Sequence, residues 1–235
     1  MKCCFSLIKR NCKLFFKDKG MFFTALITPL ILLLLYATFL ANIYRDSFAS
    51  AMPEGFAFDE SIIDATVGGQ LISSLLAVSC VTVAFCSNLM TVQDKVTGAL
   101  KDLTVSPVRK SALAVSYFAA SALVTLIVTL SAFGICMLYL AKVGWYMSLS
   151  DVLLMLADVL LLTLFGTALA SCVNFPLSTN GQASAVGTVI SACYGFICGA
   201  YMPISNFSDG LQRALMFLPG TYGTSLLRSH AMNGV

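Results

Sequence analysis

Charged side chains are scarce in this sequence, and three long tracts contain none at all. They make up 11% of the residues, against about a quarter in soluble proteins. The uncharged tracts run over 65–93, 111–141 and 159–208. This scarcity excludes an ordinary soluble domain. An apolar helix of about 20 residues crosses the roughly 30 Å hydrocarbon core of a bilayer, so each tract predicts membrane-spanning helix.

Other absences narrow the function. No G-x-x-x-x-G-K-[ST] phosphate loop occurs, so the chain has no such route to bind a nucleotide, and we expect no cofactor on it. The nine cysteines include no CxxC pair and the one histidine, His230, is remote in sequence, so we expect no metal site. An intramembrane enzyme would need a cluster of His, Asp, Glu or Ser side chains at membrane depth, which this lone histidine does not supply.

Positive charge is concentrated at the amino terminus. Within residues 1–20, Phe5, Ile8, Cys12 and Phe15 share one helical stripe, while lysines recur every four residues on another. This pattern suits either a helix lying flat on the inner membrane surface or a basic tail that only sets the topology. Anionic lipid headgroups account for the charge without a nucleic acid. The six basic residues are Lys2, Lys9, Arg10, Lys13, Lys17 and Lys19.

Hydropathy and charge together predict an all-α, polytopic membrane protein with a single transmembrane domain over 1–235. Ten basic residues fall on the predicted inner side, in 1–20 and 92–110, and four on the outer side, which places the amino terminus in the cytoplasm. The acidic stretch 42–64 and the amphipathic segment 203–235 are expected outside. The five predicted spans are 21–41, 65–91, 111–141, 151–172 and 182–202.

The inner loop 92–110 is the most specific local feature. It carries charges of both signs, has apolar Val96, Leu100 and Leu103 at helical spacing, and ends in a proline that stops a helix. Such a short helix can dock in the groove of a partner. A plain solvated turn between two spans is the alternative.

This loop resembles the coupling helix of the permease subunits of ABC-2 type exporters. Asp94, Gly98, Leu103 and the run Ser106-Pro107-Val108 look like members of that family's pattern. A second similarity joins Gly199-Ala200-Tyr201-Met202-Pro203-Ile204 and Phe217-Leu218-Pro219-Gly220-Thr221-Tyr222 to the outer re-entrant segment of the family. The basic stretch before the first predicted span fits its connecting helix.

The resemblance implies a permease that exports a drug, peptide, lipid or glycan across a bacterial plasma membrane. A separate ABC-type ATPase subunit would bind and hydrolyse ATP, and the permease would form a homodimer or heterodimer in contact with membrane lipid. The family usually has six spans, so we expect the sequence to be truncated before a sixth; loss of that span by divergence is the alternative. The expected coupling residues are Asp94, Lys95, Gly98, Leu100, Lys101, Asp102, Leu103 and Pro107.

Two features of the later tracts are further candidates. Small residues recur every four positions in the fifth predicted span, which favours close packing of helices within the chain or across a dimer. They are Ala183, Gly187, Ser191, Gly195 and Gly199. A substrate groove is the remaining alternative. Asp158 is the one ionisable residue clearly within a span, so it is expected to be a substrate contact or a proton site. The alternative is that it lies near the outer face and is partly hydrated or simply protonated.

A proton- or ion-coupled secondary transporter is the alternative function. Such a transporter would be expected to show internal repeats and paired charges near the midplane of the membrane. The sequence shows no repeat, and no intramembrane charge beyond Asp158.

Overall fold

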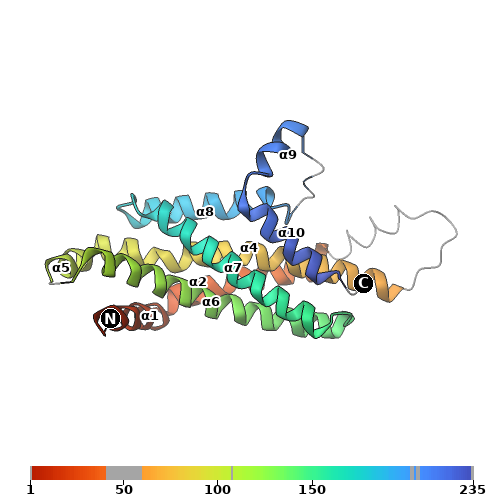
Figure 1. Cartoon of the computed structure of the whole chain (residues 1–235), viewed down its shortest axis with the longest axis horizontal. Helices are drawn as coiled ribbons and strands as arrows, with labels where there is room; N and C mark the ends of the chain where they lie inside the picture. Colours follow the sequence, from red (N-terminus) through yellow and green to blue (C-terminus); the bar gives the residue numbers. More distant parts are fainter. Residues whose placement is uncertain (1, 41–59, 107, 202–203, 205–206, 234–235) are drawn as a thin grey trace. The chain divides into compact units, whose positions relative to one another are not determined.

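The structure is a computed structural model that describes residues 2–40, 60–106, 108–201, 204 and 207–233, and in this part of the chain it contains helices and no strand (Figure 1). The all-α prediction is therefore confirmed. The elements are α1 Lys2–Lys17, α2 Lys19–Leu35, the π-helical turn η1 Tyr36–Leu40, α4 Glu60–Val96, α5 Ala99–Val105, α6 Lys110–Val143, α7 Leu149–Asn174, α8 Asn180–Ile197, α9 Asp209–Leu215 and α10 Pro219–Ala231.

Three of these helices are long and apolar enough to cross a membrane: Asp64–Val96 within α4, then α6 and α7. The pair α1 and α2 counts as a fourth candidate if its two helices form one span, bent by 75°. The predicted fifth span corresponds to α8, which is not among these candidates. Its first turn contains Asn180, Gly181 and Gln182, whose polarity lowers the mean hydropathy of an 18-residue helix.

The bend between α1 and α2 has a local cause. The carboxylate of Asp18 accepts hydrogen bonds from the amides of Gly20 and Met21, at 3.0 and 3.2 Å, and so caps the start of α2. The buried row of α1 is Leu7, Asn11 and Phe15, one position per turn. The sequence predicted an apolar stripe through Phe5, but that side chain is 71% exposed.

The helices divide into two compact units, of which unit 1 comprises Met1–Thr28, Ser79–Thr129 and Leu162–Tyr194. Its apolar core joins Phe15 of α1 and Ala25 of α2 to residues of α4 and α6. Hydroxyl groups add to this packing, because Ser87 of α4 lies 2.8 Å from the Ser121 hydroxyl and 2.7 Å from that of Thr125. The close approach of α4 and α6 is thus held by both apolar and polar contacts.

Unit 2 comprises Pro29–Val78, Leu130–Leu161 and Gly195–Val235. A methyl group added at Gly69 of α4 would lie 3.0 Å from the carbonyl oxygen of Ala231, so α10 packs closely on α4 here. The expected outer segment 203–235 forms α9 and α10, with Pro219 in the first turn of α10. Most of the expected outer loop 42–64 lies outside the described residues.

Candidate functional site

The segment expected to couple the chain to an ATPase forms the short helix α5 and the turn before it, between α4 and α6 (Figure 1). Gly98 separates α4 from α5 with φ of 83° and ψ of −7°, in the left-handed region. A side chain with a Cβ atom is strained in this conformation, which explains the need for glycine. No atom lies within 4 Å of a Cβ built there, so backbone geometry and not crowding sets the constraint.

Two leucines hold α5 against its neighbours. Leu100 and Leu103 pack on a cluster formed by Leu7 of α1 with Leu113 and Tyr117 of α6. No residue of α5 is itself fully buried, so the helix lies on the surface of unit 1 and is attached along one face. The apolar contacts of α5 are therefore with α1 and α6.

The other residues of the predicted coupling set differ in their surroundings. Lys101 and Asp102 are exposed, and their side chains make no ion pair or hydrogen bond with any residue that the structure describes. Lys95 contacts the end of α7, where its Nζ donates to the backbone carbonyls of Asn174, Phe175 and Leu177 at 3.3, 2.6 and 3.2 Å. Pro107 lies outside the described residues.

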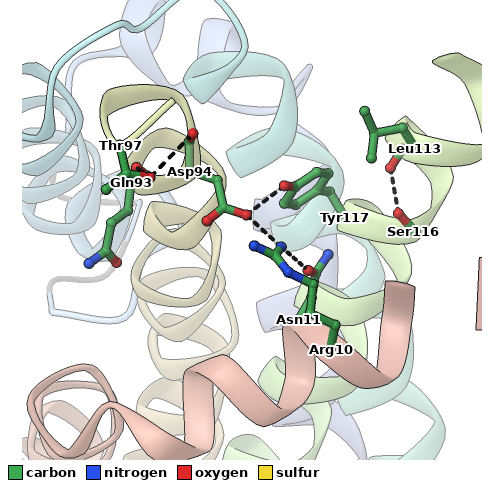
Figure 2. A network of polar contacts seen from close by, with 8 residues as sticks. All are labelled: Arg10, Asn11, Gln93, Asp94, Thr97, Leu113, Ser116 and Tyr117. Atoms are coloured by element: carbon green, nitrogen blue, oxygen red, sulfur yellow. Dashed lines mark hydrogen bonds and ion pairs between the residues drawn. The ribbon is translucent and has the colours of Figure 1, made fainter. Parts of the chain in front are cut away.

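Asp94 is the polar centre of this region (Figure 2). It is 7% exposed, and its Oδ2 accepts hydrogen bonds from Arg10 Nη1 at 2.8 Å and from the Tyr117 hydroxyl at 2.6 Å. Arg10 Nη1 also donates to Asn11 Oδ1 at 2.9 Å. The hydrogen bond to Asp94 raises the pKa of Arg10 above its ordinary value, so the guanidinium stays charged. One carboxylate thus links α1, α4 and α6.

Asp158 has a partner that the sequence did not predict. Its Oδ2 lies 2.6 Å from Nδ1 of His230 in α10, and it is 6% exposed. Two further contacts attach the end of α10: Asn233 donates to Asp151 Oδ1 at 3.0 Å, and Arg228 donates to the Gly199 carbonyl at 3.0 Å. Among the described residues, no three His, Cys, Asp or Glu side chains form a group that could hold a metal ion.

The predicted row of small residues in α8 does not form one continuous ridge. Ala183 is fully buried, and a methyl group at Gly187 would lie 3.8 Å from Phe85 of α4. Gly195 faces the ring of Tyr201, and Gly199 adopts φ of 70° beyond the end of the helix. Ser191 is half-buried. Contacts within the chain therefore occupy three of these positions, and a turn accounts for the fifth.

Three residues that contact Asp94 or Asp158 were missed from the sequence: Arg10, Tyr117 and His230. Arg10 looked like one of six equivalent basic residues, and Tyr117 lies in an uncharged tract. His230 is 72 positions from Asp158, so no local pattern relates the two. An unpaired aspartate in an apolar tract was the one signal, because it requires a partner somewhere in the fold.

A family model described as ABC-2 type transporter matches residues 2–231 of the chain. No curated protein and no solved structure matches it.

Proposed function

The chain belongs to the ABC-2 type transporter family, and from this premise we propose that it exports a substrate using ATP hydrolysed by a separate ABC-type ATPase subunit. The family supplies membrane permease subunits of ABC transporters, and the apolar helices are those of a membrane-embedded protein. We propose a substrate that is a drug, peptide, lipid or glycan, and an amino terminus and α5 on the cytoplasmic side of a bacterial plasma membrane. ATP binds to the ATPase, not to this chain.

The attachment of α5 to unit 1 is the observation that carries this proposal. The surface of α5 offers Lys101 and Asp102 to a partner, while Leu100 and Leu103 fix its other face to α1 and α6. A force applied to α5 by the ATPase would move these helices as a body, which is how a rigid-body switch works. The link from Asp94 to Arg10 and Tyr117 makes α4 part of the same body.

Charge reversal on the exposed face of α5 tests the coupling. We expect Lys101→Glu and Asp102→Lys to abolish transport with a co-expressed ATPase, because they reverse the charges that α5 offers to this partner. The fold should be unaffected, since these side chains make no ion pair or hydrogen bond with any described residue. Lys142→Glu is the matched control, since Lys142 is also exposed but lies at the opposite end of α6. Unchanged transport at normal membrane abundance would remove α5 from the coupling role. Introducing bulky charged residues at Gly98 and Leu103 should have the same effect as the reversals.

A dimer of permease subunits is part of the same proposal. Most small residues of the row in α8 already contact other residues of the same chain. A second permease would therefore contact the other face of the helix, where Ala185, Val189 and Ala192 are exposed. Small side chains allow the close approach of two membrane helices. Disulfide cross-linking of two copies through Ala185→Cys, with Ala183→Cys as the buried control, tests this face.

The pair of His230 and Asp158 favours a second candidate, a proton-coupled secondary transporter. Here Asp158 would be a proton site, and histidine is the side chain most suited to gain and lose a proton near neutral pH. Reconstituted vesicles distinguish the two candidates. Uptake that is driven by a pH gradient without nucleotide supports the secondary transporter, whereas uptake that requires the ATPase and ATP supports the exporter.

A further inference from the structure

A cavity of about 280 Å³ lies in unit 1 beside α5, and neither the coupling role nor the family accounts for it. Its walls come from α4, α5, α6 and the end of α7. This volume is close to the lower end of the range for small-molecule pockets. It suits a headgroup and the adjoining part of a chain better than a whole large ligand.

The cavity has two lysines at one end, and both apolar and uncharged polar side chains along its walls. On α4 it runs from Asn88 to Lys95, which is about 10 Å along the helix axis. Lys95 and Lys110 lie at the ends of their apolar spans, where lipid headgroups lie. Leu113 and Phe118 of α6 supply apolar wall along the first turns of that span. A ligand that matches this wall must be amphiphilic.

The charged side chains that line the cavity favour a ligand of negative charge. Among the described residues, both charged side chains in the wall are lysines and no carboxylate lines it. Lys95 is already held by three backbone carbonyls, whereas the exposed Lys110 makes no side-chain hydrogen bond or ion pair with any described residue. Asp94 lies nearby in sequence, but Arg10 neutralises it. An anionic group would therefore meet the Lys95 ammonium, which is held by carbonyls, and the Lys110 ammonium, which has no partner in the described part of the chain.

We propose that this cavity binds one anionic phospholipid, with its phosphate at Lys110 and its chain along Leu113 and Phe118. Leu100 and Thr104 of α5 form part of the wall, one helical turn apart, so the lipid completes the packing of a helix that buries no residue of its own. The lipid is a bound component of the α5 region. It is distinct from the exported substrate and from the ATPase contact on the exposed face of α5.

Native mass spectrometry of the full chain in detergent tests the proposal, with phosphatidylglycerol as the probe and phosphatidylcholine of the same acyl chains as the comparison. We expect one phosphatidylglycerol to bind preferentially. Lys110→Ala should weaken its binding about fivefold, the factor that one basic side chain contributes near an anionic surface. Lys110→Arg should retain the binding because it keeps the charge.

Two control variants distinguish binding in the cavity from a general effect of charge or of side-chain size near it. Arg109→Ala removes the same charge one residue away, outside the cavity wall, and should leave binding unchanged. Ala114→Trp places a large ring in the wall and should block binding, whereas Val115→Trp adds the same ring to an exposed position that does not line the cavity. Equal effects of Lys110→Ala and Arg109→Ala would overturn the proposal, and so would equal binding of the two lipids.

Glycerol 3-phosphate tests whether the headgroup alone is sufficient. We expect it not to displace the lipid at comparable concentration, because it lacks the apolar contact with Leu113 and Phe118. Displacement would show a simple anion site and overturn the lipid assignment. None of these measurements depends on transport or on ATP hydrolysis, so a failure of the proposed export function would leave their outcome readable.

Discussion

Asp94 in unit 1 and Asp158 in unit 2 are both buried aspartates of long apolar helices, but they are satisfied in different ways. Asp94 has two donors, from Arg10 and Tyr117, at 2.8 and 2.6 Å. Among the described residues Asp158 has one partner, His230, at 2.6 Å. Arginine keeps its charge at any physiological pH, whereas histidine is charged only when protonated. The first contact is therefore an ion pair, whereas the second is a hydrogen-bond contact that is also an ion pair only with a protonated ring.

Removing Arg10 should have the largest effect. Arg10→Ala leaves the Asp94 carboxylate buried with only the Tyr117 hydroxyl, and we expect a loss of about 2 to 3 kcal/mol in the free energy of unfolding. This is less than the cost of breaking a fully buried pair, because the Arg10 side chain is 34% exposed. Chemical unfolding of the purified chain, followed by circular dichroism, measures it.

The double variant Arg10→Ala with Asp94→Asn is the control for this effect. A neutral amide can still accept from Tyr117 but carries no charge to neutralise, so the double variant should be more stable than Arg10→Ala alone. Equal stability of the two would show that Arg10 acts through packing and not through its charge.

Removing His230 should have a smaller and more local effect. His230→Ala leaves Asp158 without its described partner, and we expect a loss of about 1 to 2 kcal/mol, within the range for a buried polar group that loses one hydrogen bond. Hydrogen exchange should show faster opening of α10, while α1 stays protected. Arg10→Ala should give the reverse pattern. Loss of protection in both helices by either variant would contradict two separate contacts.

The sequence predicted the class of the protein well because its main signals are local. Uncharged tracts of sufficient length identify membrane helices, and the residues around Gly98 carry the family resemblance that the family match confirms. The partners Arg10 and His230 were not predictable, because they lie 84 and 72 positions from Asp94 and Asp158 and neither stands in a recognisable motif. Tyr117 is only 23 positions from Asp94, but nothing in its uncharged tract marks it as a partner. The row of small residues in α8 stays a prediction as an interface, but its extent was not predictable: helical periodicity does not show where α8 ends, and Gly199 lies beyond its last turn.

Gly98 tests whether the backbone conformation between α4, which carries Asp94, and α5 requires glycine. We expect Gly98→Ala to cost about 1 kcal/mol, because alanine is strained at φ of 83°. Gly181→Ala is the matched control. Both glycines have open space around a built Cβ, but Gly181 lies in the first turn of α8 without a positive φ, so alanine there should be neutral or slightly stabilising. Equal effects in an unfolding experiment would show that φ does not set the requirement at Gly98.

The smallest expected loss of stability comes from removing neutral hydrogen bonds of α4. It is the reference against which the losses expected for Arg10→Ala and His230→Ala are compared. Ser87→Ala removes a hydroxyl that contacts both Ser121 and Thr125, yet such bonds between membrane helices average only about 0.6 kcal/mol. Ser79 is the matched control on the same helix: its hydroxyl is buried and has no partner among the described residues. Ser79→Ala should therefore be neutral or stabilising, because it removes an unsatisfied polar group. If both variants lose the same stability, loss of packing and not of hydrogen bonding dominates in α4, and the costs expected for Arg10 and His230 would have to be attributed to packing as well.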